Sequence, residues 1–282
     1  MGSEMCIRDS WYILEAQDVA NSGWNYTSAS SFITISFWIK SSVAQNFYGV
    51  LYTADGTAQN YVYETGSLTA DTWTKIVKTI PGNSNITVDN NTEAGLYWAP
   101  ARAFDGTDRT ASMSLNAWGA YSGSSRTPDA TPTWYTTNDA TLEITGLQME
   151  VGPQATAFEH RSFGEELSLC QRYYYRWTAG STDRYAWMGQ SFGSGACFGI
   201  VRTLPVTMRA VPTSSVSGTY TPYGADGSTS GHSAFSSTNM DQNNTDHLGT
   251  GGWGGASGMS AGNAVVVLAS EAAAYIDASA EL

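Results

Sequence analysis

The segment from residue 144 to residue 177 constrains the fold more than any other part of the sequence. It begins with the alternating apolar residues of a β-strand and continues into a pattern that is typical of an amphipathic helix. Ser162 followed by Glu165 has the spacing of a capping box, which marks a helix start. Apolar residues then recur at intervals of four and three positions, as on one helical face: Phe163, Leu167, Cys170, Tyr174 and Trp177. The sequence therefore predicts two regions joined by a short helix within residues 161–177.

The predicted helix needs a partner surface. A helix of about 15 residues is marginal by itself in water, so its apolar stripe must be buried against something. Either the helix lies on a β domain of its own chain, or three copies pack around a three-fold axis like a short coiled coil. The spacing of the apolar residues is compatible with both arrangements.

The region before the helix has the pattern of an antiparallel β-sandwich. From Ile33 to Lys40 the residues alternate strictly between two faces, which predicts a half-buried strand with Trp38 opposite its core face. Turn-rich pieces separate further predicted strands at residues 48–53, 61–65, 73–80, 95–99 and 141–151. In the last of these the alternation changes phase at Gly146, which predicts a β-bulge. Short strands at this spacing predict an all-β sandwich.

The region after the helix also reads as β structure. Strands are predicted at residues 185–192, 196–203, 206–208, 264–269 and 275–282, the last as a closing strand. Between Gly224 and Asn263 the chain consists mainly of Gly, Ser, Thr and Asn, which predicts long loops with little core content. In these loops Trp253, flanked by glycines, is expected either to be exposed for contact or to insert into a neighbouring subunit. Loops on a rigid scaffold often carry binding function, so recognition of a partner is a hypothesis for this segment.

Composition restricts the classes of partner. Charged residues make up 13% of the 282 residues, against roughly 25% in an average globular protein, and the formal net charge is −12 with only three lysines. Nucleic acids and anionic membranes are therefore poor partners, because phosphate neutralisation dominates such binding. The sequence has no apolar run long enough for a membrane span and no signal-peptide pattern, and its three cysteines lack C-x-x-C spacing. A surface rich in hydroxyls, amides and aromatic rings suits neutral glycans, and it equally describes inert β scaffolds.

No catalytic constellation is indicated, so the protein is predicted not to be an enzyme. Residues 189–193 match the G-x-S-x-G nucleophile elbow, but no helical pattern follows, which favours a glycine-rich turn. A glycosidase needs two carboxylates at a defined separation, and nothing selects a pair from the available ones: Glu143, Glu150, Glu165 and Glu166.

The sequence does not decide whether the protein binds a metal ion. Two groups offer the oxygen ligands that calcium prefers, Asp89, Asn90, Asn91 and Glu93 in one and Asp105 and Asp108 in the other. Solvated turns are the favoured explanation of both groups. No other cofactor is expected.

Aromatic side chains are the remaining candidates for ligand contact. Exposed rings stack on sugar faces while neighbouring polar side chains give directional hydrogen bonds. The glycan-binding candidates are Trp38, Tyr97, Trp98, Trp118, Tyr121, Trp134 and Trp253. The alternative for each is a place in the core or in a subunit contact.

The junction resembles one found in tail-fibre and other virion structural proteins of tailed bacteriophages. The residues that carry the resemblance are the strand Ile-Thr-Gly-Leu-Gln-Met-Glu-Val-Gly at 144–152, Phe-Glu-His-Arg at 158–161, and Cys-Gln-Arg-Tyr-Tyr at 170–174. The run Leu-Pro-Val-Thr-Met-Arg-Ala-Val-Pro-Thr at 204–213, followed by Ser217-Gly218, resembles the C-terminal knob of the same proteins. The resemblance implies an all-β chain in three parts: a jelly-roll domain similar to carbohydrate-binding modules at 11–160, a trimerising helix at 161–177, and a C-terminal β-sandwich knob at 178–282.

The resemblance also implies a function and a place of action. It favours adhesion to host-surface glycan without catalysis, by a homotrimer in the virion tail that contacts other tail proteins outside the cell. It also raises the expectation of a structural calcium ion. Two alternatives remain: the non-catalytic C-terminal part of a capsule-degrading tailspike enzyme, and a secreted bacterial carbohydrate-binding module.

The first ten residues are expected to be foreign to the protein. Met-Cys-Ile-Arg-Asp-Ser at 5–10 resembles the translation of a transposase mosaic-end adapter, a contaminant of assembled metagenomic reads. Such segments are excluded from fold reasoning. Residues 12–19 resemble an interior strand of the bacteriophage jelly roll and not its first strand. The jelly roll is therefore expected to be truncated at its start.

Overall fold

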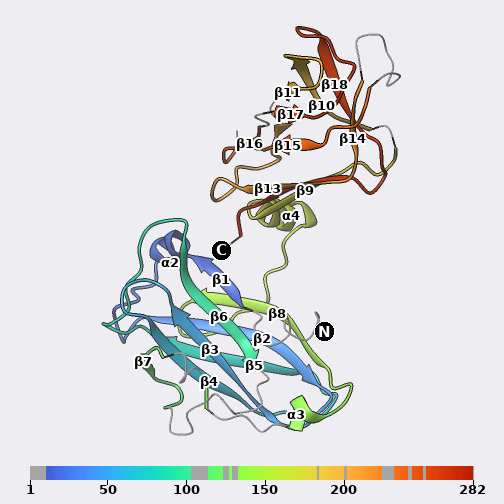
Figure 1. The fold of residues 1–282 in the computed structure, drawn as a ribbon. Helices are drawn as coiled ribbons and strands as arrows, with labels where there is room; N and C mark the ends of the chain where they lie inside the picture. Colours follow the sequence, from blue (N-terminus) through green and yellow to red (C-terminus); the bar gives the residue numbers. More distant parts are fainter. Residues whose placement is uncertain are drawn as a thin grey trace. The chain divides into compact units, whose positions relative to one another are not determined.

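A computed structural model describes residues 11–281 except 103–113, 123–126, 129–132, 183, 200–201, 224–231, 241–242 and 250–251. The expected foreign segment 1–10 lies outside the described residues. Nearly all regular structure in the described part is β, as predicted, and three short helices complete it (Figure 1). The chain divides into two compact units between His160 and Arg161. Each unit has its own hydrophobic core and is described by itself.

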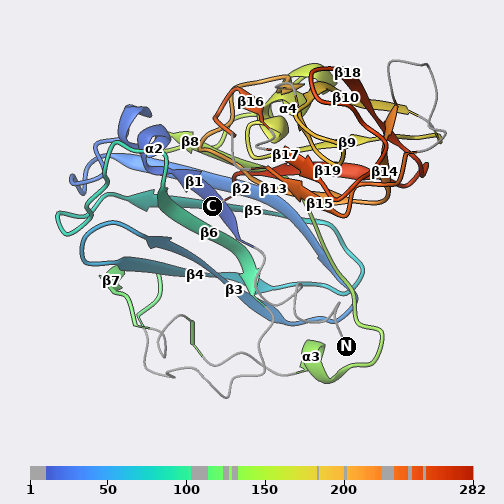
Figure 2. The same cartoon turned by 45° about the horizontal axis from the view of Figure 1, so that its top comes forward.

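The first unit is a sandwich of two antiparallel sheets (Figure 2). The five-stranded sheet has the order β1 (Tyr12–Glu15), β6 (Ala94–Arg102), β3 (Asn46–Thr53), β4 (Gln59–Ser67) and β7 (Trp118–Ala120). The three-stranded sheet has the order β5 (Thr74–Pro81), β2 (Phe32–Ser41) and β8 (Leu142–Val151). Residues of both sheets form one core between them, so the predicted sandwich is confirmed.

Most of strand β2 is covered on both faces. Its apolar residues Ile33, Ile35, Phe37 and Ile39 are buried in the core, as their alternation predicted. The opposite face is less exposed than a half-buried strand implies, because Thr34 and Ser36 are buried too. The chain that follows β8 covers them: the Thr34 hydroxyl donates to the carbonyl of Gly152, and the Thr79 hydroxyl donates to that of Pro153.

The predicted β-bulge at Gly146 is confirmed. Ser36 pairs with Gln148 and Trp38 pairs with Thr145, so Gly146 and Leu147 together face one residue of β2. Gly146 has a φ of 61°, in the left-handed region that glycine adopts without strain. Leu142 and Ile144 before the bulge and Met149 after it all pack against the core.

Most strands predicted in the first unit are present, with two differences. The strand predicted over residues 12–19 ends at Glu15, and α2 (Ala16–Asn21) follows. The backbone N–H groups of Ala16 and Gln17 donate to carbonyls of residues 93 and 91, so the loop before β6 caps this short helix. Strand β7 and helix α3 (Thr133–Thr136) were not predicted, because each is too short to show periodicity.

The second unit is built from two antiparallel sheets and a strand pair. The six-stranded sheet has the order β14 (Tyr220–Tyr223), β18 (Ala264–Ala269), β10 (Arg184–Ser191), β11 (Cys197–Gly199), β17 (Gly252–Gly254) and β15 (Ser237–Asn239). The three-stranded sheet has the order β13 (Thr213–Ser217), β19 (Tyr275–Ser279) and β9 (Tyr174–Thr178), and β12 (Arg202–Thr203) pairs with β16 (His247–Leu248). The closing strand predicted at the end of the chain is β19, which lies in the middle of its sheet.

Two predictions for the second unit were wrong. Residues 206–208 are not a strand. The region 224–263, predicted to have little core content, contributes β15, β16 and β17, and its Trp253 is 0% exposed in the core of its own unit. Trp253 contacts the rings of Trp187, Tyr220 and Phe235. The glycines around this large ring let the backbone pack closely on a core residue. Composition alone does not distinguish such a segment from a loop.

The linking helix is shorter than predicted. Helix α4 spans Phe163–Gln171, and Tyr174 and Trp177 lie in strand β9 instead of on the helical face. The predicted capping box is confirmed, since the Ser162 hydroxyl accepts from the N–H of Glu165 and the Glu165 carboxylate accepts from the N–H of Ser162. The run of aromatic residues at 173–177 favours a strand, and pairing of β9 with β19 satisfies its backbone hydrogen bonds.

Candidate functional site

Trp98 and Trp134 are core or near-core residues and not ligand platforms. Trp98 is 1% exposed, and its indole N–H donates to the hydroxyl of Tyr63 at 2.9 Å. Leu96 and Trp98 lie two positions apart on β6, so both side chains point into the same core. Trp134 packs edge-on against Phe47 and donates its indole N–H to the carbonyl of Thr141. With Trp253 buried as well, Trp98 and Trp253 are corrected from candidate platforms to core residues.

Tyr97 and Tyr121 are held in a stack on the outer face of the five-stranded sheet. Tyr52 lies between them, with ring centroids 4.6 Å from each. Trp11 meets Tyr52 and Tyr97 edge-on. Because the rings cover one another's faces, this cluster offers little free face for stacking on a sugar.

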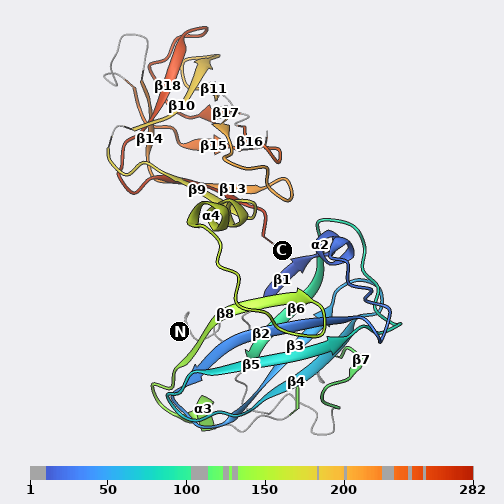
Figure 3. The same cartoon turned by 180° about the vertical axis from the view of Figure 1, so that it is seen from behind.

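Trp38 is the exposed candidate on the other sheet, where β8, β2 and β5 run side by side (Figure 3). Its side chain is 41% exposed and pairs across the strands with Lys75 and Thr145. Trp38 and Phe158 both pack above Gly146. This surface offers an open ring, whereas Trp118 lines a pocket, so Trp38 is the weaker candidate.

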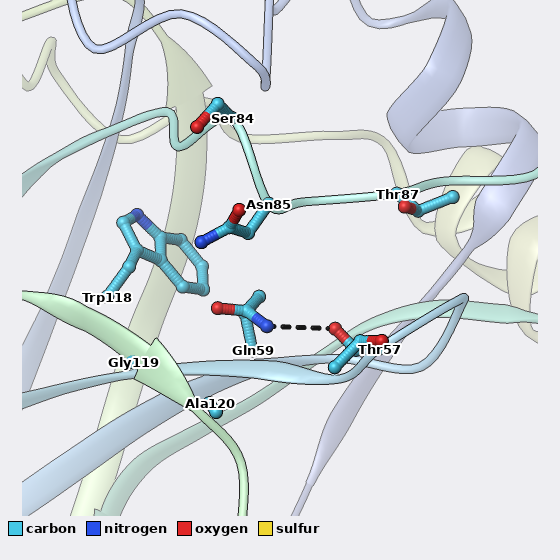
Figure 4. Close-up of a pocket in the computed structure, with 8 residues that line it drawn as sticks. All are labelled: Thr57, Gln59, Ser84, Asn85, Thr87, Trp118, Gly119 and Ala120. Atoms are coloured by element: carbon cyan, nitrogen blue, oxygen red, sulfur yellow. Dashed lines mark hydrogen bonds between the residues drawn. The ribbon is translucent and has the colours of Figure 1, made fainter.

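Trp118 lines a pocket, which we call the Trp118 pocket. The pocket has a volume of about 500 Å³, within the usual range for ligand sites of about 300–1,000 Å³. It lies at the edge of the sandwich, between strands β4 and β7 and the loop that follows β5 (Figure 4). Its lining residues are Thr57, Gln59, Ser84, Asn85, Thr87, Trp118, Gly119 and Ala120. None of these eight side chains carries a charge, and five of them have a hydroxyl or amide group.

The indole of Trp118 is fixed as one wall of the pocket. Its N–H donates to the carbonyl of Pro81 at 2.6 Å, at the end of β5. On the inside it contacts the ring of Tyr61, with centroids 5.4 Å apart. Burial raises the pKa of Tyr61 above its ordinary value, so this phenol stays neutral. Because the indole N–H is already used, Trp118 can offer a ligand only its apolar ring surface.

Gln59 forms the polar floor. It is 4% exposed, and its amide nitrogen donates to the carbonyls of Thr57 and Ala58 at 2.9 and 3.2 Å. The backbone N–H of Gln59 donates to the hydroxyl of Thr53. These bonds fix the amide orientation, and the side-chain oxygen faces the Trp118 side of the pocket (Figure 4).

Asn85 forms the opposite wall. It lies in a turn in which the side chain of Asn83 accepts the N–H of Asn85 at 2.9 Å, while Ile86 is buried in the core. Asn85 is exposed, and its amide points toward Trp118 across from Gln59 (Figure 4). Within the described residues, its side-chain amide makes no hydrogen bond.

Two contacts join the loops that build the pocket. The Asp55 carboxylate accepts the backbone N–H of Asp89 at 2.8 Å. Gly56, with a φ of 60°, lies against Thr87, where a Cβ atom would be 2.9 Å from the Thr87 side chain. Glycine is therefore required at position 56 both for the turn and for the close approach of the two loops.

The polar residues of the pocket were not predicted from the sequence. Ser84 and Asn85 belong to a turn and Gln59 begins a strand, positions at which polar residues are ordinary. Of the lining residues, the sequence predicts only Trp118 as a candidate. The sequence does contain the two polar turns that help to build the pocket, at residues 54–57 and 82–85. They are far apart in the chain, so nothing in the sequence indicates that they meet.

The described residues contain no group of three or more His, Cys, Asp or Glu side chains that would hold a metal ion. In the first predicted calcium group, the Asn91 side chain accepts the N–H of Glu93, and the N–H of Asp89 is bound by Asp55. Asp105 and Asp108 lie outside the described residues. In the same described part, no helix is long and apolar enough to cross a membrane.

The G-x-S-x-G match is part of a β-hairpin. Strand β10 ends at Ser191 and is followed by the antiparallel strand β11, without an intervening helix. The Ser191 hydroxyl is buried and donates to the carbonyl of Ser260. This geometry is that of a turn and not of a nucleophile elbow.

The predicted self-association residues lie on two kinds of element. No residue of α4 is buried, and Phe163 is 83% exposed, with Leu167 and Cys170 also exposed. Tyr174 and Trp177 are half-buried in β9, on opposite faces of its sheet. The second unit also exposes large apolar side chains around the β10–β11 hairpin, which are Tyr185, Met188, Phe192 and Phe198.

No protein-family model and no curated protein sequence matches the chain. Among solved structures, it is similar to recombinant discoidin II of Dictyostelium discoideum, with 13% identity over 90% of this chain and 74% of that chain, and a TM-score of 0.19. It is also similar to the PBSX exported protein XepA, with 8% identity over 96% of this chain and 87% of that chain, and a TM-score of 0.16. Both TM-scores are under 0.5, so neither likeness bears on function.

Proposed function

We propose that this protein is a non-catalytic virion protein of the tail-fibre or receptor-binding type, which binds neutral host-surface glycan in the Trp118 pocket. The observation that carries the proposal is the composition of that pocket. Uncharged hydrogen-bonding side chains face a fixed indole wall in a space of about 500 Å³. Sugars combine apolar ring faces with many neutral hydroxyl groups, so they need this pairing of surfaces.

The charge of the chain supports a neutral ligand. With a net charge of −12, the protein repels phosphates and other anions at long range. The carboxylate of Asp55 lies in the loop beside the pocket, and none of the lining residues is basic. An anionic sugar would therefore lose its hydration without gaining a cationic partner.

The virion assignment rests on the resemblance of residues 144–176 to the junction of bacteriophage tail proteins. A homotrimer is supported by α4, a nine-residue helix that buries none of its residues within the described chain. Such a helix needs tertiary packing, which other copies of the chain would supply. Other tail proteins are the expected neighbours in the virion.

Binding is tested with a glycan array on the intact protein, followed by calorimetric titration of the best neutral glycans. We expect Trp118→Ala to weaken binding at least about tenfold, equivalent to about 1.4 kcal/mol. Asn85→Trp fills the pocket from an exposed position and should abolish binding without disturbing the core. Trp38→Ala is the matched control, since it removes an exposed tryptophan of the same unit and should leave affinity unchanged. The proposal is wrong if no neutral glycan binds, or if Trp38→Ala and not Trp118→Ala removes binding.

A further inference from the structure

We propose that the Trp118 pocket selects sugars that carry an acetamido group, the N-acetylhexosamines, over plain hexoses. The inference rests on the glycan-binding function proposed above and specifies its ligand class. It follows from three features that converge in the pocket: an acceptor of fixed orientation, an amide donor and an apolar ring (Figure 4).

The acceptor is the side-chain oxygen of Gln59. Because the amide nitrogen is bound to the carbonyls of Thr57 and Ala58, the amide cannot rotate to present a donor instead. The residue is 4% exposed, and its oxygen accepts no hydrogen bond from any described residue. A ligand that displaces water from this oxygen must therefore supply an N–H or O–H group of its own.

The donor is the amide nitrogen of Asn85. It projects toward Trp118 from the wall opposite Gln59 (Figure 4). The main chain of Asn85 is held by the Asn83 side chain, which limits how far the donor can move. A ligand carbonyl placed between the two walls would accept this N–H group.

The apolar element is the face of the Trp118 indole. Its only hydrogen-bonding atom already donates to Pro81, so the ring offers contact but no polar partner. A methyl group packs on such a surface with a gain from burial.

An acetamido group complements all three elements. It carries one N–H group for Gln59, one carbonyl for Asn85 and one methyl group for Trp118, in a single rigid plane. A hydroxyl can both donate and accept, but the 2-hydroxyl of a plain hexose must meet both walls through a single oxygen, whereas the acetamido group uses two separate atoms. The hydroxyl also brings no methyl group to Trp118. Sites built in this way reject the analogue that lacks the matching group, because their polar atoms stay unpaired.

The test is calorimetric titration of the full chain with the methyl glycosides of N-acetylglucosamine, N-acetylgalactosamine, glucose and galactose. We expect at least one N-acetylated sugar to bind about tenfold or more tightly than its plain counterpart, the equivalent of one or two net hydrogen bonds. Asn85→Ala should reduce this ratio to near one. Asn85→Asp keeps the shape but removes the donor, and it should have the same effect.

The outcomes separate the two proposals. If plain hexoses bind as tightly as the N-acetylated sugars and Trp118→Ala weakens both, the pocket binds glycans but the inference is wrong. If the preference persists in Asn85→Ala, the assigned donor is wrong and the inference fails. If none of the four sugars binds, the inference fails, and the glycan array then decides the proposed function separately. Trp38→Ala serves again as the control and should retain the full ratio.

Discussion

The two units of this chain present different kinds of surface. In the first unit the accessible aromatic ring of Trp118 stands among uncharged amides and hydroxyls at a pocket. In the second unit large apolar side chains are exposed on α4 and around the β10–β11 hairpin. A ring among hydrogen-bonding groups suits a small polar ligand, whereas apolar side chains exposed together suit another protein surface.

This difference teaches that aromatic content alone does not identify a binding site. Trp98 and Trp118 belong to the same unit, and both donate their indole N–H groups within it. What separates them is the strand position, which puts Trp98 inside and Trp118 at the sandwich edge. Recognition and self-association are accordingly expected to respond to different substitutions.

The largest expected effect concerns self-association of the second unit. Leu167→Asp places an unpaired charge in the predicted seam of the trimer, which is costly when buried. We expect light scattering to give three times the chain mass for the original protein and one chain mass for the variant. Glycan affinity per chain should not change, because the Trp118 pocket belongs to the first unit.

The matched variant is Met188→Asp, on the apolar surface around the β10–β11 hairpin. If Met188→Asp dissociates the trimer and Leu167→Asp does not, the contact between subunits lies at the β10–β11 hairpin surface and not on helix α4. An original protein of one chain mass at micromolar concentration would refute the trimer altogether.

The next effect is the loss of a core tryptophan from either unit. Trp98→Ala and Trp253→Ala each remove a fully buried ring, so each should lower the free energy of unfolding by about 3–5 kcal/mol. Each unit has a separate core, and we expect each variant to shift mainly the thermal transition of its own unit. Calorimetric scanning checks this, and equal shifts of a single transition in both variants would show that the units unfold together.

Sequence patterns predicted the parts of the fold that are governed by local periodicity. The alternation in β2, the phase change at Gly146 and the capping box at Ser162 each depend on residues a few positions apart. Burial of Thr34 and Ser36 could not be predicted, because it depends on the chain after β8, over 110 residues later. The end of α4 was missed because Tyr174 and Trp177 fit both a helical face and a strand, and pairing with β19 decides between them.

The site was predicted less well than the fold for a similar reason. Gln59, Asn85 and Trp118 come from three segments that only the sandwich brings together. Each of them occupies a position where its residue type is ordinary. The sequence predicted Trp118 as one of seven aromatic candidates. Its neighbours in the folded structure distinguish it from the other six.

A smaller effect is expected at the bulge beneath Trp38. Gly146→Ala places a Cβ atom on a residue with a φ of 61°, which costs about 1–2 kcal/mol, and brings that atom to 3.4 Å from the Trp38 ring. The melting temperature of the first unit should fall while glycan affinity is kept, because the bulge between β8 and β2 contributes no residue to the pocket. Lost affinity in this variant would join the Trp38 surface to the recognition site and weaken the contrast with Trp118.

The smallest effect is a pH dependence confined to the second unit. Asp277 accepts two hydrogen bonds from Arg176, at 2.6 and 2.8 Å, and one from the hydroxyl of Tyr174. The bonds from Arg176, followed by that from Tyr174, hold the pKa of Asp277 below its ordinary value despite partial burial. The stabilisation is therefore present above the unfolded-state pKa of about 3.9 and is lost as the pH falls through the lower pKa of the folded state.

Asp277→Asn removes this contribution and tests its sign. The substitution should lower the melting temperature of the second unit at pH 7. The difference from the original protein should shrink below about pH 4, where the carboxylate is protonated first in the unfolded chain and, at lower pH, in the folded protein. The stabilisation from the Arg176–Asp277 pair is modest, because Arg176 is half-exposed and solvent screens the interaction. The melting temperature of the first unit should be the same in both proteins at each pH. A constant difference across this pH range would show that Asp277 acts through its packing and not through its charge.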